Sequence, residues 1–315
     1  MYSDLGLEQK KRSYESVAGR YDMPPSNRGA SSLMIGKRAD GLPDVSIEAK
    51  LRTKFCDLPS SDPTKHCFVK EILTTIAHSP NQLSVDKTTN TLYFSFDFGQ
   101  GEYVPAILHM ETRNLSVLKG VKDAFAIAND PTTGEMYFGG SHGIYKYSAA
   151  KKILQRLNIN NLDIWWLFIK KNIFFIKFPS LSAYYYENKT IKAVPELRGD
   201  IVHQFVFDKE DNIFFINGSG LFGIKHDDTT PVLLRDHPRF LGIATDNNGF
   251  VHVCSEDGIF VVTQMVPKVK KVINVQGVLG MTFDKSNNII YSDSHEIIRL
   301  LPLSRENYNE NDRGL

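Results

Sequence analysis

Three aspartates recur at one fixed interval in the second half of the chain. Asp208, Asp246 and Asp284 are each 38 residues apart, and each lies between two short apolar runs, as in FVFDKEDNIFFI, IATDNNGFVHVC and MTFDKSNNIIYS. Asp86 and Asp130 stand in similar segments closer to the N-terminus. A period of this size with one local pattern in every unit predicts a repeat fold rather than one mixed domain.

The spacing also predicts a unit that lacks the aspartate. From Asp130 to Asp208 is 78 residues, or two periods, and LFIKKNIFFI fills the gap with Lys170 at the aspartate position. Asn and Gly between the apolar runs suit the positive φ of a tight hairpin, and a third strand follows a glycine in GIYKY, GLFGI and GIFVV. Six units of about 40 residues without a helical period predict an all-β, six-bladed β-propeller over residues 65–303.

The repeated aspartate has two possible roles. We expect it to cap its own hairpin by accepting local backbone N–H bonds. The alternative is a calcium ligand, which the variable residues around each aspartate disfavour because they form no ligand loop.

Composition restricts the partners. The formal charge is +1 with Lys and Arg scattered, so nucleic acid is not an expected partner. No apolar run approaches the roughly 18 residues of a membrane span, and the hydrophobic fraction of 42% suits packed blades. The chain contains no G-x-S-x-G nucleophile motif, phosphate-binding Gly loop or C-x-x-C pair. We expect a monomer that binds a small molecule, with no cofactor and no metal.

The ends of the chain differ from the repeats. Residues 1–50 are poor in apolar runs and predict a disordered extension, 51–64 lead into the propeller, and 304–315 form a polar tail. Basic clusters ending at Arg12 and Arg38 are candidate processing sites of a peptide precursor; the alternative is that they are ordinary dibasic pairs of a solvated tail. MYSDLGLEQKK holds no apolar signal-peptide core, so we expect either an intracellular protein or another native start.

Cysteines and sequons bear on the compartment. Cys56 and Cys67 flank a short polar loop and are a candidate disulfide, but three cysteines allow three single pairings and the sequence does not choose among them. Cys254 falls in a predicted strand, where a buried free thiol is usual. Asn114, Asn188 and Asn217 begin glycosylation sequons, which matter only in a secreted protein.

The repeats resemble a known family. NTLYFSF, GEMYFGGSHGIYKY, DIWWLFIKKNIFFIKFPS, DNIFFINGSGLFGIK, DGIFVV and NNIIYSDSHEIIRL are similar, in order, to the insect ommochrome-binding proteins. The resemblance covers about three quarters of the chain and leaves out the first 50 residues. It implies a secreted haemolymph carrier for ommochromes, the tryptophan-derived pigments of insects.

The repeat places a candidate ligand site at one end of the channel. The start of each innermost strand opens on the same face as the loop after the second strand. Counting back from each turn aspartate gives flat aromatic and polar side chains, the usual lining of a small-molecule site. The predicted ligand-binding residues are Asn81, Phe125, Trp165, His203 and Arg239, joined by the loop residues Lys177, Asn217 and Asp293.

Alternatives remain for these residues and for the function. The aromatic rings could pack between blades, and His203 could be a structural histidine. Propellers of the regucalcin and gluconolactonase kind are metal-dependent lactone hydrolases, but an acidic cluster dense enough for a metal is absent from these positions. A protein-interaction propeller and a peptide hormone fused to a carrier are further alternatives.

Overall fold

The structure is a computed structural model of the 315-residue chain, and it describes residues 52–56, 67–76, 82–97, 103–121, 123–159, 162–263 and 269–302. The predicted extension, the C-terminal tail and the processing candidates Arg12 and Arg38 lie outside the described residues. The chain divides into two compact units, one of which is Leu73–Arg299 and the other Met1–Ile72 with Leu300–Leu315.

Apart from one 3-10 turn, η1 (Pro195–Leu197), every regular element in the described residues is a strand, and the strands form six antiparallel sheets. Three of these sheets come first in the chain, and each runs in order along the sequence. The first contains β3 (Leu83–Asp86), β4 (Thr91–Asp97), β5 (Tyr103–His109) and β6 (Asn114–Val117). The second contains β7 (Ala124–Asn129), β8 (Met136–Gly140), β9 (Gly143–Ser148) and β10 (Ile153–Arg156). The third contains β11 (Ile164–Ile169), β12 (Ile173–Lys177), β13 (Ser182–Glu187) and β14 (Thr190–Ala193).

The remaining sheets follow the same plan until the last. The fourth contains β15 (Gln204–Phe207), β16 (Ile213–Asn217), β17 (Gly220–Ile224) and β18 (Val232–Arg235). The fifth contains β19 (Phe240–Thr245), β20 (Val251–Ser255), β21 (Gly258–Val262) and β22 (Val269–Ile273). The sixth has the order β1-β2-β25-β24-β23 and combines β1 (Arg52–Cys56) and β2 (Cys67–Thr75) with β23 (Gly280–Phe283), β24 (Ile289–Ser292) and β25 (Glu296–Pro302).

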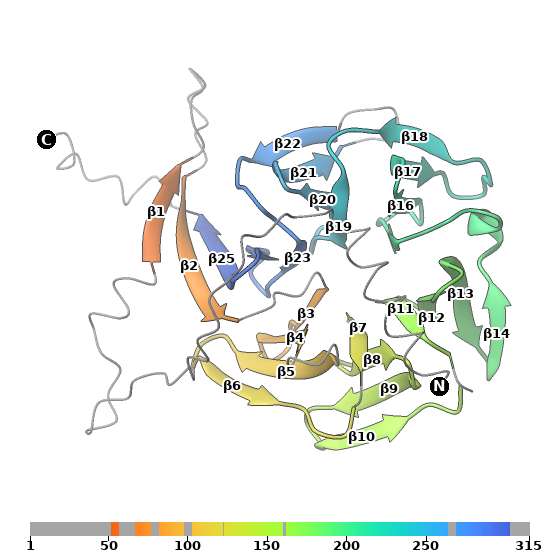
Figure 1. Cartoon of the computed structure of the whole chain (residues 1–315), viewed down its shortest axis with the longest axis horizontal. Coiled ribbons are helices and arrows are strands. Elements are labelled where there is room, and N and C mark those ends of the chain that lie inside the picture. Colours follow the sequence, from red (N-terminus) through yellow and green to blue (C-terminus); the bar gives the residue numbers. More distant parts are fainter. Residues whose placement is uncertain are drawn as a thin grey trace, which may run out of the picture. The chain divides into compact units, whose positions relative to one another are not determined.

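The innermost strands of the larger unit form a closed ring. β3 contacts β7, β7 contacts β11, and the series continues through β15, β19 and β23 back to β3. Figure 1 shows the labelled strands β3, β7, β11, β19 and β23 around the centre, with β6, β10, β14, β18 and β22 outside them. The expected six-bladed β-propeller is therefore confirmed.

The repeated aspartates cap the hairpins at the ends of the inner strands. The Oδ1 atom of Asp208 accepts the N–H groups of Glu210 and Asn212 at 2.8 and 2.9 Å, and its Oδ2 accepts the Asn212 side-chain amide at 2.8 Å. Asp284 makes the same three bonds within its own turn. Asp86, Asp130 and Asp246 likewise accept backbone N–H groups that follow them. The predicted capping role is confirmed, because a carboxylate satisfies turn donors that the strands leave unpaired.

In the third unit, which has no turn aspartate, Lys170 bonds to the next blade. Lys170 donates to the backbone oxygen of Asp208 at 3.2 Å and pairs with the carboxylate of Asp211, both in the next blade. A cation here joins neighbouring turns instead of capping its own. The turns of blades five and six are also joined, since the Asn247 N–H donates to Asn287 Oδ1 at 2.8 Å.

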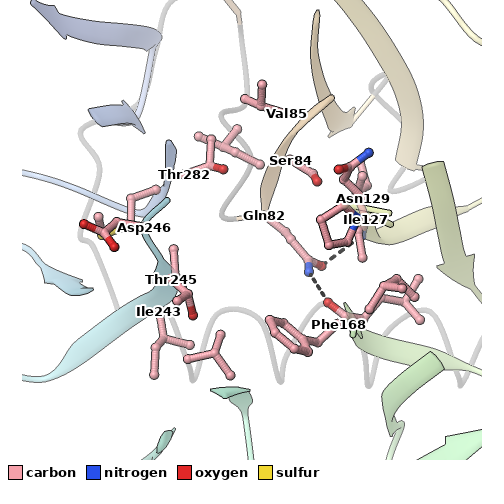
Figure 2. A pocket seen from close by; sticks show the side chains of 18 of the residues that line it. Gln82, Ser84, Val85, Ile127, Asn129, Phe168, Ile243, Thr245, Asp246 and Thr282 are labelled. Carbon is pink, nitrogen blue, oxygen red and sulfur yellow. Dashed lines mark hydrogen bonds between the residues drawn. The ribbon is translucent and has the colours of Figure 1, made fainter. Parts of the chain in front are cut away.

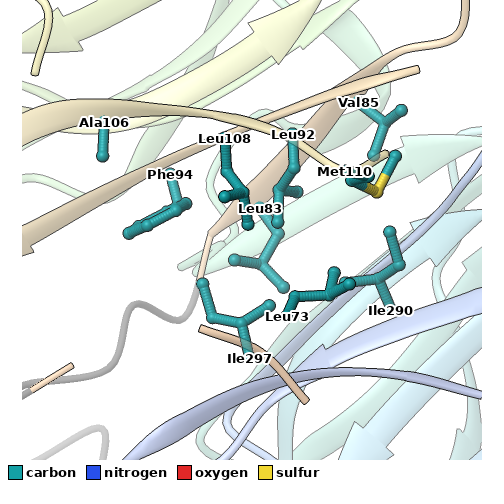
Figure 3. Close-up of a cluster of buried hydrophobic side chains, with 10 residues drawn as sticks. All are labelled: Leu73, Leu83, Val85, Leu92, Phe94, Ala106, Leu108, Met110, Ile290 and Ile297. Atoms are coloured by element: carbon teal, nitrogen blue, oxygen red, sulfur yellow. The ribbon is translucent and has the colours of Figure 1, made fainter. Parts of the chain in front are cut away.

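Apolar side chains fill the spaces between neighbouring blades. Figure 3 shows the cluster between the first and last blades, where Leu73, Ile290 and Ile297 pack with residues of β3, β4 and β5. The ring closes here, since Ile76 N–H also donates to the His295 carbonyl at 2.8 Å. β2 comes from before the first repeat, so the sixth blade combines both ends of the propeller sequence.

In the smaller unit, β1 and β2 pair antiparallel, with Cys56 opposite Cys67 in the backbone register. Cys67 is disulfide-bonded, and Cys254, in the larger unit, is free and buried. The side chain of Cys56 lies outside the described residues. The segment that precedes the propeller thus contains a strand, which its polar composition did not predict.

Candidate functional site

A cavity of about 310 Å³ lies in the channel between the inner strands, toward the ends that carry the capped turns. Its walls are mainly apolar, and Ser84, Asn129, Thr245 and Thr282 add hydroxyl and amide groups (Figure 2). The volume is at the lower end of the roughly 300–1,000 Å³ typical of small-molecule sites. The apolar wall residues include Val85, Ile127, Trp166, Phe168, Ile169, Val206, Ile243 and Met281.

Two buried glutamines at the starts of inner strands bond to neighbouring blades, and one of them, Gln82, lines the cavity. Gln82 accepts the Ile127 N–H at 3.0 Å and donates its amide to the Leu167 carbonyl at 3.2 Å (Figure 2). Gln204 holds the equivalent position in the fourth blade, where it accepts the Ile243 N–H at 3.1 Å and donates to the Leu241 carbonyl at 3.1 Å. A glutamine amide suits this position because it both donates and accepts.

These bonds satisfy backbone groups that the sheets leave unpaired. An innermost strand is a sheet edge, so its channel-facing N–H and C=O groups lack partners in the sheet. Trp166 and Thr245 contribute in the same way, by donating to the carbonyls of Phe205 and Phe207 at 3.0 and 3.2 Å. The channel wall is therefore fixed by side chains that reach from one blade to another.

Lys87 brings a cation to the cavity. It follows the capping residue Asp86, is half-buried and lines the cavity. Burial lowers the pKa of Lys87, and the nearby charge of Asp246 acts in the opposite direction. The Asp246 carboxylate is held by the N–H groups of Asn248 and Phe250 at 2.9 and 2.8 Å. The described residues give the Lys87 ammonium no hydrogen-bond or ion-pair partner.

The sequence-predicted aromatic residues lie at the other end of the inner strands. Phe125 and Trp165 stack with ring centroids 4.7 Å apart, Trp165 also stacks on Phe178, and Tyr103 meets Phe125 edge-on. Both predicted residues fall at β-bulges, where the register shifts in β7 and β11. Trp165 is 2% exposed and Phe125 6%, so their faces are covered by each other and by neighbouring rings.

The predicted polar residues lie at this strand-start end as well. His203 is half-buried, and burial followed by the charge of Arg239 lowers its pKa. Lys177 stands opposite Ile164, next to Trp165, in the strand pairing. The structure therefore groups Trp165 with Phe125 and Lys177, and His203 with Arg239.

Two further predicted residues at this end are used in local bonds. Asn217 donates to the Ile201 carbonyl at 3.2 Å, and the carboxylate of Asp293 accepts the N–H groups of His295 and Glu296, both at 2.8 Å. Asn81 lies outside the described residues. Of the sequon residues, Asn114 and Asn188 are exposed, whereas Asn217 is half-buried.

Of the residues predicted from sequence to bind the ligand, none that the structure describes lines the channel cavity. Reasoning from sequence missed Gln82, Gln204 and Lys87, although a signal was present. Four residues before the turn aspartate, the first and fourth units carry Gln where the second, fifth and sixth carry Ala126, Gly242 and Gly280. A polar side chain recurring at a position otherwise occupied by small residues indicates a bonded role inside the channel.

The cavity offers apolar surface, hydroxyl and amide groups and one lysine ammonium. Among the described residues, no group of three or more His, Cys, Asp or Glu side chains could hold a metal ion. The turn aspartates, which are the regular acidic feature, are occupied as caps. None of the helices in the described part of the chain is long and apolar enough to cross a membrane.

The fold and the channel define the class of this protein: a six-bladed β-propeller with a small, mostly apolar central cavity. No family model matches the sequence. The chain is 30% identical over 241 residues to the ommochrome-binding protein of Manduca sexta, and the match covers 74% of this chain and 87% of that protein. The chain belongs to the family of ommochrome-binding proteins, as its resemblance to that family indicated.

Solved structures with the same fold include enzymes. A gluconolactonase from Xanthomonas campestris has a TM-score of 0.63 at 13% identity, covering 79% of this chain and 95% of that one. Regucalcin from Agrobacterium tumefaciens, a calcium-binding protein, has a TM-score of 0.55 at 9% identity, covering 75% and 94%. At these identities the similarity concerns the fold alone.

Proposed function

We propose that this protein is a non-catalytic binding protein for a small planar pigment of the ommochrome kind. The observation that carries the proposal is the match to a protein named for binding ommochrome, which spans 74% of this chain and 87% of that relative. The channel supports it, because apolar walls with a few hydroxyl, amide and ammonium groups suit a ligand that combines apolar rings with polar substituents.

Both ends of the channel contain groups that could contact such a ligand. At the strand-start end, Arg239 and His203 provide positive charge or hydrogen bonds, and the Phe125–Trp165 stack provides an aromatic base. Because these two rings are covered on their faces, a pigment there would meet ring edges rather than open faces. At the turn end, the cavity of about 310 Å³ lies between the inner strands.

A metal-dependent lactone hydrolase is the second candidate, favoured by the likeness to the gluconolactonase fold. Such an enzyme needs several oxygen or nitrogen ligands around a cation that polarises the lactone carbonyl. The described residues hold no cluster able to supply them, so they do not fit that metal. This disagreement favours binding over hydrolysis.

Secretion is part of the proposal. Structural disulfides persist in oxidising compartments, and Cys67 is disulfide-bonded. Exposed Asn114 and Asn188 would be accessible to glycosylation. Mass spectrometry of the native protein before and after reduction and deglycosylation tests this point, since a reduced and unmodified protein would contradict it.

The function is tested by calorimetric titration of the full-length protein with an ommochrome and with xanthurenic acid, in calcium and in chelator. Gluconolactone hydrolysis is measured on the same samples, with heat-denatured protein as control. We expect saturable one-site binding that chelator does not change, and hydrolysis no faster than the control. Calcium-dependent hydrolysis without pigment binding would make the protein an enzyme and refute the carrier function.

A further inference from the structure

Three turns carry a lysine directly after the capping aspartate, but the three lysines have different surroundings. The pairs are Asp86-Lys87, Asp208-Lys209 and Asp284-Lys285. Lys209 and Lys285 are exposed, and neither lines the channel cavity. Lys87 is half-buried and lines it. Of the three lysines at this repeat position, Lys87 is therefore the one that lines the cavity.

The surroundings of Lys87 favour a bound anion. Burial penalises its charged form, and Asp246, the acidic residue that lines the cavity with it, has its oxygens occupied by Asn248, Phe250 and Asn287. A partly desolvated ammonium gains most from a carboxylate that completes its hydrogen bonding. The same cavity has apolar walls, to which Val85, Ile127 and Ile243 contribute.

The size of the cavity limits the ligand. A volume of about 310 Å³ corresponds to roughly ten water molecules at about 30 Å³ each. Gln82 and Gln204 bridge the strands at the end away from the turns, so a ligand would enter from the turn end. These dimensions suit a compact, one- or two-ring aromatic acid inserted edge-first.

We propose that the turn-end half of the channel is a binding site for a small planar aromatic carboxylate, whose carboxylate pairs with Lys87 and whose rings lie between the apolar walls. This inference rests on the proposed binding function and gives it a location, at the end of the channel opposite to the one predicted from sequence. Ser84, Thr245 and Thr282 face the cavity and are positioned to bond ring hydroxyl or carbonyl groups (Figure 2).

The test uses calorimetry on the full-length protein with xanthurenic acid, a two-ring aromatic acid, as the probe. Lys87→Gln removes the cation, and its matched control is Lys285→Gln, which changes the same turn position on an exposed side chain outside the cavity. We expect Lys87→Gln to weaken binding by roughly 10- to 100-fold, the range for losing a charged hydrogen bond, and Lys285→Gln to change it less than about twofold.

A second variant tests the cavity walls. Thr282→Phe places a ring in the cavity and should abolish binding while the thermal unfolding midpoint stays near that of the parent protein. Arg239→Ala changes the strand-start end, the other candidate location, and serves to distinguish the two locations. Fluorescence adds an independent readout, since Trp166 lines the cavity and Trp165 does not. Quenching by the probe should therefore be lost in Trp166→Phe and retained in Trp165→Phe.

The outcomes separate the location from the function. Binding that is lost in Arg239→Ala but unchanged in Lys87→Gln and Thr282→Phe would overturn the turn-end site and keep the carrier function. No saturable binding of either an ommochrome or xanthurenic acid to the parent protein would refute both. If Lys87→Gln and Lys285→Gln weaken binding equally, the loss comes from the change in net charge. The proposed pairing of the ligand carboxylate with Lys87 would then be wrong.

Discussion

Replacing Gln204 with leucine tests whether side chains that cross between blades hold the channel together. The side chain is 3% exposed, and its amide satisfies the Ile243 N–H and the Leu241 carbonyl, which sheet pairing leaves on the channel edge. Leucine is close in size, so the cost comes from two unsatisfied buried groups rather than from a void. At about 1–3 kcal/mol for each group, and with some relief from water in the adjoining cavity, we expect Gln204→Leu to lower the free energy of unfolding by about 2–4 kcal/mol.

Guanidinium unfolding followed by tryptophan fluorescence measures this change. Gln155→Leu, on the exposed outer strand β10, is the matched control and should stay within about 0.5 kcal/mol of the parent protein. Gln82→Leu should cost a similar amount and add to Gln204→Leu within about 0.5 kcal/mol, because the two glutamines share no partners. If Gln204→Leu is as stable as the Gln155→Leu control, the bridging bonds do not stabilise the ring and the reasoning is refuted.

Two further predictions concern titrating groups. Burial raises the pKa of the Cys254 thiol to about 12. Iodoacetamide at pH 8 should therefore leave Cys254 unmodified in the native protein and label it after unfolding, which peptide mass spectrometry measures. Rapid labelling of the native protein would contradict the burial of this thiol. Burial also lowers the pKa of His252, more than Asp246 and the Phe250 carbonyl raise it. The folded state then binds fewer protons than the unfolded state, so the contribution of His252 to stability is complete above the unfolded-state pKa of about 6.5 and is lost as pH falls below it. His252→Gln should reduce the loss of stability between pH 7 and pH 5 in urea titrations, and an unchanged slope would exclude His252 as a cause.

The turns explain why so much of the fold could be predicted from sequence. An aspartate that accepts N–H groups two and four residues later, as Asp208 and Asp284 do, acts within a single hairpin. Its pattern is therefore contained in a few consecutive residues and recurs with every blade. The short apolar runs that mark the strands are equally local, and the turns and runs together determined the number of blades and the period.

The candidate site depends on contacts between residues far apart in the chain. Gln82 bonds to residues 45 and 85 positions away, and no local pattern indicates which backbone groups it will meet. Position in the repeat placed Phe125 and Trp165 correctly at the strand-start end, yet it could not show that their rings cover each other. Side-chain exposure depends on neighbouring blades, and the repeat does not specify those neighbours.

The sequence by itself determined a six-bladed ring of capped hairpins, because turns and apolar strand segments are set by residues close together in the chain. Only the tertiary structure decided how the ring closes, with β2 joining β23–β25, and which of three equivalent lysines faces the channel. Both depend on packing between blades, where identical positions in the repeat meet different neighbours. For Lys87, Lys209 and Lys285, burial in the assembled ring distinguishes a cavity residue from two exposed ones.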